Sequence, residues 1–274
     1  MDSLSPGSAE EFRNTVYAHY RESGRSFPWR ETRDPYRILV SEIMLQQTQT
    51  DRVVPKYLDW LERFPTVESL AGAPFQAVLE KWVGLGYNRR AKYLHEAAKA
   101  VVRDFGGVFP RDAKSLMLLP GVGHYTASAV STFAFGIPNA FIETNIRAVY
   151  LFFFLSAEEG VHDDRIMELV EATMDREDPR SWYYALMDYG ATLKKKVVNP
   201  NRKSRHYAKQ SRFTGSLREA RGAVVRHIGK TGPSRVEEIA LAEGIEIERV
   251  ALAAKSLFDD GMVAETDGVY RISE

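Results

Sequence analysis

The residues of this chain best suited to hold an anion are two glycines that flank one apolar residue, Gly121-Val122-Gly123. They follow Pro120 and precede a helical pattern that begins at His124. Glycine adopts a positive φ at little cost and lets another backbone approach closely. A helix that starts directly after Gly123 points its free amides and the positive end of its dipole outward, which suits a nucleic-acid phosphate. A tight turn between two core helices is the alternative, since a lone Gly-x-Gly motif is weak.

The composition limits the chemistry available elsewhere. The 274 residues are 44% hydrophobic and include 37 basic and 37 acidic residues, so any attraction to nucleic acid must be local. Cysteine is absent, which excludes disulfides, a cysteine nucleophile, thiolate zinc sites and cysteine-bound iron–sulfur clusters. No basic segment leads into an N-terminal apolar run, and the densest apolar stretch, 149–155, is too short for a bilayer. We expect a cytoplasmic protein, of the bacterial or archaeal cytosol or nucleoid, with no membrane contact.

Helical spacing of apolar residues predicts an all-α domain of about ten helices around the glycine turn. The patterns cover residues 8–22, 36–63, 66–72, 75–82, 88–104, 112–118, 124–135, 144–156, 163–175 and 180–194. Clear alternation of period two is missing from these residues. Glycines and prolines such as Gly106, Pro110 and Gly136 separate the patterns.

The chain changes character after this domain. Residues 194–214 form a basic segment without an acidic residue, either a solvated linker or a contact to phosphate. Residues 215–274 predict a small winged-helix domain, with helices over 217–228, 235–243 and 247–260 and a hairpin that turns at Asp267-Gly268. Its third helix carries only Arg249 and Lys255 among several acids, so DNA binding and protein contact both stay open.

Further blocks accompany the glycine turn in a fixed order. Phe27-Pro28-Trp29-Arg30 precedes the block Ser-Glu-Ile-Met-Leu-Gln-Gln-Thr-Gln-Thr at 41–50, and Gly-Leu-Gly-Tyr-Asn-Arg-Arg-Ala follows at 84–91. Ile-Glu-Thr-Asn-Ile-Arg comes after the turn, at 142–147. With these motifs, the stretch 27–191 resembles the helix–hairpin–helix (endonuclease III-like) DNA glycosylases, in particular the mismatch adenine glycosylases. The resemblance assigns residues 1–193 to the glycosylase domain.

The resemblance implies a monomeric base-excision enzyme that acts on double-stranded DNA with a mismatched or damaged base. Such an enzyme flips the base out of the helix and cleaves its glycosidic bond. Glu42 matches the acid that protonates the leaving base, and desolvation on its apolar helix would raise its pKa. Glu143 stands where the family has an aspartate beside the developing sugar cation. Asn145 supports that site, and Tyr125 replaces the lysine of relatives that also cut the backbone, which implies a monofunctional enzyme.

The resemblance also assigns the contacts to DNA. In the family, a glutamine at the position of Gln47 wedges into the gap, and a tyrosine at the position of Tyr87 inserts beside the opposing base. The implied DNA-binding residues are Gln46, Gln47, Thr48, Tyr87, Asn88, Arg89, Gly121, Val122, Gly123, Tyr125, Lys194, Lys196, Arg202, Lys203 and Arg205. The implied base pocket consists of Arg25, Trp29, Arg30 and Leu45. No metal or other cofactor is expected.

Three departures from the family pattern keep alternatives open. Glu143 is one methylene longer than aspartate, and a displacement of about 1 Å can cost about a hundredfold in rate. The four cysteines that usually bind an iron–sulfur cluster in relatives are replaced, near Lys194, Asn201, Ser204 and Gln210. The residues after Gly215 are too few for the Nudix-like domain of adenine enzymes. A uracil or thymine mismatch glycosylase and a weakened DNA-damage binding protein are therefore the alternatives.

Overall fold

The computed structural model describes residues 6–209 and 212–273, and the chain forms two compact units. The first unit comprises Met1–Leu39, Pro110–Met117 and Gly123–Lys209. The second unit comprises Val40–Phe109, Leu118–Val122 and Gln210–Glu274. The boundaries predicted from the sequence, 1–193, 194–214 and 215–274, stay a prediction.

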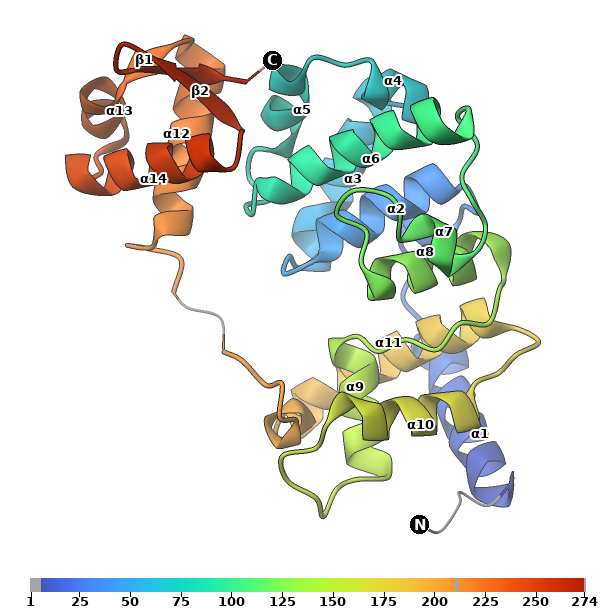
Figure 1. Cartoon of the computed structure of the whole chain (residues 1–274). Helices are drawn as coiled ribbons and strands as arrows, with labels where there is room; N and C mark the ends of the chain where they lie inside the picture. The colour runs from blue at the N-terminus through green and yellow to red at the C-terminus, as the bar shows by residue number, and fades with distance from the viewer. Residues whose placement is uncertain (1–5, 210–211, 274) are drawn as a thin grey trace. The chain divides into compact units, whose positions relative to one another are not determined.

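Helices dominate both units, as Figure 1 shows. Those before the C-terminal segment are α1 (Pro6–Ser23), α2 (Pro35–Leu45), α3 (Thr50–Arg63), α4 (Val67–Ala71), α5 (Phe75–Trp82), α6 (Arg89–Phe105), α7 (Ala113–Leu116), α8 (His124–Phe135), α9 (Thr144–Phe153), α10 (Asp163–Thr173) and α11 (Pro179–Lys196). Two short 3₁₀ helices, η1 (Pro28–Arg30) and η2 (Pro200–Lys203), accompany them. The predicted all-α class is confirmed. None of the helices in the described ranges has both the length and the apolar composition needed to cross a bilayer.

Two of the helical stretches differ from the sequence prediction in ways that affect the predicted site residues. The stretch 36–63 is two helices, α2 and α3, because the backbone turns at Gln46–Thr48, where Gln47 has a φ of 59°. Helix α11 extends to Lys196, so Lys194 belongs to a helical turn rather than to a linker. Basic side chains in a last turn interact favourably with the negative end of the helix dipole, which explains the extension.

The first unit is built around α11, which packs against α9 and α1. Asp178 starts α11 by accepting a hydrogen bond from the Ser181 amide at 3.1 Å, and Pro179 occupies the first helical position. Trp182 is fully buried beside Phe12 of α1, with ring centroids 5.6 Å apart. Phe12 also packs against Tyr150 and Phe153 near the C-terminal end of α9, so aromatic contacts join the three helices.

The second unit contains the end of α2, helices α3 to α6 and the C-terminal module. Helices α3 to α6 pack around Trp60 and Trp82, whose ring centroids lie 5.6 Å apart at full burial. The C-terminal module consists of α12 (Leu217–Thr231), β1 (Ser234–Arg235), α13 (Val236–Glu243), α14 (Ile247–Asp259), β2 (Val263–Thr266) and β3 (Val269–Ile272). Its antiparallel sheet has the order β1-β3-β2.

The C-terminal module confirms the predicted winged-helix order of three helices and a hairpin, shown in orange and red in Figure 1. Strand β1 was not predicted, since two residues are too few for a periodic pattern. The hairpin pairs Thr266 with Val269 across Asp267-Gly268, and both turn residues have a positive φ. Helix α12 packs against α5 of the same unit.

Candidate active site

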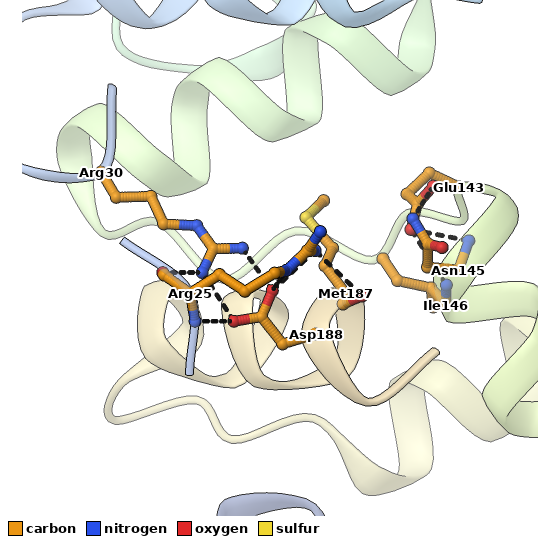
Figure 2. Close-up of polar contacts among 7 residues, drawn as sticks. All are labelled: Arg25, Arg30, Glu143, Asn145, Ile146, Met187 and Asp188. Atoms are coloured by element: carbon orange, nitrogen blue, oxygen red, sulfur yellow. Dashed lines mark hydrogen bonds and ion pairs between the residues drawn. The ribbon is translucent and has the colours of Figure 1, made fainter. Parts of the chain in front are cut away.

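Glu143 is the N-cap residue of α9, and its side chain folds back over the first turn of that helix (Figure 2). Oε1 accepts hydrogen bonds from the Asn145 amide at 2.7 Å and the Ile146 amide at 3.1 Å. Oε2 accepts one from Asn145 Nδ2 at 3.2 Å. The carboxylate is only partly exposed. The extra methylene of glutamate is thus absorbed by a capping turn, and the charge is held at the helix end where the dipole favours it.

The turn that carries Glu143 rests on α11 at Gly190. A Cβ at Gly190 would overlap the backbone carbonyl of Asn145. The close approach of α9 and α11 at this point therefore requires glycine at position 190. A glycine inside a helix weakens it intrinsically. Gly190 therefore marks a packing requirement of the Glu143–Asn145 turn.

Gly190→Ala is expected to displace the Glu143–Asn145 turn and to lower the free energy of unfolding by about 1–3 kcal/mol through overpacking. The matched control is Gly222→Ala in α12, where the new Cβ would have no atom within 4 Å beyond its own stretch of helix backbone. That control should gain up to about 1 kcal/mol. Urea denaturation of both variants measures the difference, and equal stabilities would contradict this reading of the helix crossing.

A buried carboxylate on α11 holds the segment before η1. Asp188 is 1% exposed, and its two oxygens accept hydrogen bonds from the Arg25 amide and Nε, both at 2.7 Å, and from the two terminal nitrogens of Arg30, both at 2.8 Å. Figure 2 shows the two guanidinium groups converging on it. Burial by itself would raise the pKa of Asp188, but the hydrogen bonds and charges of Arg30 and Arg25 hold it below its usual range. The prediction that Arg25 and Arg30 line a base pocket stays a prediction.

The lowered pKa of Asp188 makes the free energy of unfolding depend on pH. Its contribution is present above the ordinary carboxyl value of 3.8 and is lost as the pH falls through the lowered folded value. Asp188→Asn should therefore lower stability at neutral pH and flatten its loss in acid. The control is Asp259→Asn, whose carboxylate makes an exposed pair with Lys255. Urea midpoints measured from about pH 7 to pH 3 test this; an unchanged acid slope in the Asp188 variant would refute it.

The basic segment after α11 is tied to the Glu143 turn. Burial lowers the pKa of Lys194, while the Glu143 charge opposes that shift and the Arg25 charge adds to it. Asn201 Nδ2 donates to the carbonyl of Thr144 at 3.0 Å. The Lys203 carbonyl accepts from the Val161 amide at 2.9 Å. The segment is thus held by hydrogen bonds next to the carboxylate.

These residues do not fit an iron–sulfur cluster, because amide, hydroxyl and ammonium groups replace the thiolates that bind one. Asn201 and Ser204 are buried parts of the hydrogen-bonded segment, and Gln210 lies outside the described residues. Among the described residues, no group of three or more His, Asp or Glu side chains is arranged to hold a metal ion.

In the second unit, Arg90 joins two turns. Its guanidinium lies within hydrogen-bonding distance of the carbonyl oxygens of Ile43, Met44, Gln46, Leu85 and Gly86 and of the Thr48 hydroxyl. Two of these carbonyls belong to the last turn of α2, where helix carbonyls lack partners. Arg90 is 8% exposed, and burial lowers its pKa to about 10, which leaves it charged at neutral pH.

The two turns joined by Arg90 carry strained residues. Gln47 has a φ of 59° and Tyr87 a φ of 48°; with Asp267 they are the non-glycine residues of positive φ in the described chain. Such conformations persist where the surroundings enforce them, and they cluster at functional sites. Glu42 lies on α2 just before the first turn and is 6% exposed.

The two glycines of the turn, Gly121 and Gly123, differ in backbone conformation and in surroundings. Gly121 has a φ of 71°, and a Cβ there would overlap the side chain of Tyr93. Gly123 has an ordinary φ of −84° and open space around its Cα, and it is the N-cap of α8 without a side-chain cap. The Val122 amide donates to the Leu119 carbonyl at 3.1 Å. The predicted phosphate-binding role of the Val122 amide thus competes with a bond inside the turn, whereas α8 begins after Gly123 as expected.

The remaining predicted residues differ in accessibility. Tyr125 is partly exposed in the first turn of α8, with its ring edge-on to Phe141 at 5.7 Å. Asn88 is buried, and Trp29 is buried in a stack with Phe27. The exposed residues are Gln47, Arg89, Lys196, Arg202 and Arg205, and the partly exposed ones include Leu45, Gln46, Thr48 and Lys194. The Lys203 ammonium is engaged by the Ser156 carbonyl at 2.5 Å and by Glu159 at 3.2 Å.

Three residues that shape these sites had no predicted role: Arg90, Asp188 and Gly190. Gly190 had a usable signal, because an isolated glycine inside a helical pattern often has a packing reason. Asp188 had none, since a charged residue in a helix is normally taken as solvent-exposed. Arg90 could not be told from Arg89 by sequence alone.

The chain is similar in sequence and structure to known DNA repair proteins. A family model described as "HhH-GPD superfamily base excision DNA repair protein" matches residues 40–208. The adenine DNA glycosylase of Mycobacterium tuberculosis is 48% identical over 186 residues, covering 65% of this chain and 60% of that protein. The thymine/uracil-DNA glycosylase of Methanothermobacter thermautotrophicus is 34% identical over 197 residues, covering 70% and 89%. A solved thermostable thymine-DNA glycosylase matches with a TM-score of 0.63 at 31% identity, covering 69% and 88%.

The lengths of the relatives differ from that of this chain. The chain spans about half the length of the adenine glycosylases it matches, between 36% and 60%.

Proposed function

Because the chain belongs to the HhH-GPD superfamily of base excision DNA repair proteins, we propose that it is a monofunctional DNA glycosylase that removes adenine from a mismatch. The observation that carries this proposal is the Glu143 turn, which presents a fixed carboxylate at the start of α9. The adenine glycosylase of Mycobacterium tuberculosis, at 48% identity, supports adenine as the base.

Glu143 stabilises the positive charge that develops on the sugar as the glycosidic bond breaks. The leaving base takes the bonding electrons, so the sugar becomes cation-like and a carboxylate beside it lowers the barrier. The Asn145 and Ile146 amides hold that carboxylate in one position before the reaction begins. Water then adds to the sugar and leaves an abasic site.

Glu42 donates the proton that the departing base needs. A general acid must carry a proton when substrate binds, and Glu42 lies on α2 with 6% exposure. After the proton has moved to the base, the carboxylate of Glu42 is ready to accept one from the attacking water.

Gln47 and Tyr87 fill the gap that a flipped base leaves in the helix. Both extend from strained turns that the Arg90 hydrogen bonds hold together. The folded protein therefore stabilises their unfavourable backbone conformations before DNA binds. The DNA backbone binds at the start of α8 and along the basic segment, through Gly121, Gly123, Lys194, Lys196, Arg202 and Arg205. An exposed helix start with free amides suits a phosphate.

Tyr125 makes the enzyme monofunctional. A hydroxyl at this position of α8 cannot form the Schiff base through which a lysine cuts the DNA backbone. The protein acts without an iron–sulfur cluster, as a monomer, in the cytosol or nucleoid.

The alternative to adenine is uracil or thymine opposite guanine. The observation that favours it is the match to the thymine/uracil-DNA glycosylase, of which this chain covers 89%, well above its coverage of the adenine enzymes. The third candidate is a binding protein for damaged DNA in which Glu143 no longer supports turnover.

A panel of duplexes separates these functions. Single-turnover excision is measured on DNA containing A:8-oxoguanine, A:G, U:G, T:G or hypoxanthine. The proposal predicts the fastest abasic-site formation from the two adenine mismatches. Faster excision from U:G or T:G would replace adenine by a pyrimidine substrate, and tight binding without product from any duplex would favour the binding protein.

A further inference from the structure

The C-terminal module contacts the turn that carries Tyr87. Arg218, the second residue of α12, donates from Nη1 to the Tyr87 hydroxyl at 2.8 Å. Its guanidinium carbon lies 5.2 Å from the centre of the Tyr87 ring, and that of Arg90 lies 5.5 Å from the same centre. Both Arg218 and Tyr87 are half-buried. The tyrosine is therefore held at its backbone by its turn, at its ring by two cations and at its hydroxyl by the module.

The position of Arg218 is itself fixed. Ser216 caps α12 by accepting a hydrogen bond from the Glu219 amide at 3.3 Å, so the first turn that carries Arg218 is well defined. Helix α12 also packs against α5, and residues of these two helices together with Ile272 line a cavity of about 250 Å³. Arg218 thus extends from the first turn of a capped helix that packs against α5.

A second set of contacts anchors the module to the same end of α6. Asp260, which is 12% exposed, pairs with Arg221 of α12 at 2.6 Å and with Arg89 at 3.1 Å. The Lys92 ammonium donates to the Asp260 carbonyl at 2.6 Å. Tyr87, Arg89 and Lys92 span less than two helical turns, so the module concentrates its polar contacts where the Tyr87 turn meets α6.

We propose that Arg218 is a positioning residue for Tyr87, through which the C-terminal module takes part in handling the mismatched pair. The proposal rests on the proposed function, in which Tyr87 enters the DNA helix. A tyrosine side chain can exchange among several rotamers unless its hydroxyl or its ring faces are held. Arg218 holds both, so it sets the direction in which the ring extends from its strained turn.

The competing interpretation is that Arg218 contacts a DNA phosphate directly. The two roles predict different effects in a double variant of Arg218 and Tyr87. A positioning residue that works through the Tyr87 hydroxyl becomes irrelevant once that hydroxyl is removed, whereas a phosphate contact adds its effect to any change at Tyr87. A phosphate contact also carries a salt dependence of about one counterion.

The test compares Arg218→Met, Tyr87→Phe and the double variant in the full chain. The matched control is Lys255→Met, which removes one positive charge from an exposed site on α14 of the same module. Single-turnover excision from an A:G duplex should fall about tenfold in Arg218→Met, the equivalent of one hydrogen bond from a charged donor. Tyr87→Phe should fall similarly, the double variant no further, and Lys255→Met should stay within about twofold of the parent. Additive losses, or a salt slope that falls by about one in Arg218→Met, would overturn positioning.

A second readout does not depend on catalysis. In protein labelled with ¹³C at the tyrosine ring carbon that bears the hydroxyl, the Tyr87 signal is identified by its loss in Tyr87→Phe. Arg218→Met should shift that signal and Lys255→Met should not, and an unmoved signal overturns the contact. If the parent protein excises no base, the proposed function fails. The positioning of Tyr87 by Arg218 is then tested by the Tyr87 ¹³C signal and by the affinity for mismatched DNA. Preference for A:G over A:T duplexes should then fall equally in Arg218→Met and Tyr87→Phe, and an unchanged preference overturns the proposal.

Discussion

Glu143→Gln is expected to reduce single-turnover excision by about 10²–10³-fold while leaving the affinity for mismatched duplex nearly unchanged. Glutamine has the length of glutamate, and its carbonyl oxygen can still accept from the Asn145 and Ile146 amides, so the capping turn survives. The negative charge that would stabilise the sugar cation is removed. The loss therefore falls on the chemical step and not on binding.

The control for this prediction is Glu171→Gln, which removes a charge from an exposed position on α10 of the same unit. Its excision rate should equal that of the parent. Glu143→Asp adds a second comparison, because it retains the charge but shortens the reach to the α9 amides. If Glu143→Gln cleaves as fast as the parent, Glu143 is not the catalytic carboxylate. If the parent is inert and Glu143→Asp cleaves, the protein binds damage without turnover.

Arg90→Lys is expected to lower the free energy of unfolding by about 3–5 kcal/mol, although it retains the positive charge. A lysine ammonium is a single point with three donors, so it cannot serve the carbonyls of both turns at once. The carbonyls that it abandons are buried and lose their partners. Release of the Gln47 and Tyr87 turns from each other should also slow excision beyond what the loss of stability explains.

The neighbouring arginine provides the control for this prediction. Arg89 has a 61% exposed side chain and pairs with Asp260, so Arg89→Lys should change stability by less than about 1 kcal/mol. Urea denaturation of both variants at one pH and salt concentration measures the contrast. Equal losses in the two variants would show that Arg90 does not fasten the turns.

The periodic features of this fold were predictable from the sequence. Helix α6 begins and ends within one residue of the predicted stretch 88–104, because its apolar residues recur on one face and Gly106 ends it in the left-handed conformation. The hairpin turn at Asp267-Gly268 was equally clear, since the dipeptide suits the positive φ that both residues adopt.

What the sequence could not supply was the use of individual polar side chains. Asp188 looks like any helical carboxylate until Arg25 and Arg30, more than 150 residues earlier in the chain, are seen to hold it. The same holds for Arg218 and Tyr87, which are 131 residues apart. Such contacts depend on tertiary placement, which leaves no periodic signal. The folding back of Glu143 was one of several outcomes open to a longer side chain, and the amides of α9 decide it.

The most direct test of the central claim is to identify the product released from an A:8-oxoguanine duplex by the full chain. Released bases are separated by chromatography and identified by mass, and strand integrity is examined before and after hot alkali. We predict free adenine, with a strand that stays intact until alkali breaks it at the abasic site. A strand cut before alkali would contradict the monofunctional mechanism. No free adenine, with the adenine-containing strand stable in alkali, would contradict the proposal that this protein excises adenine.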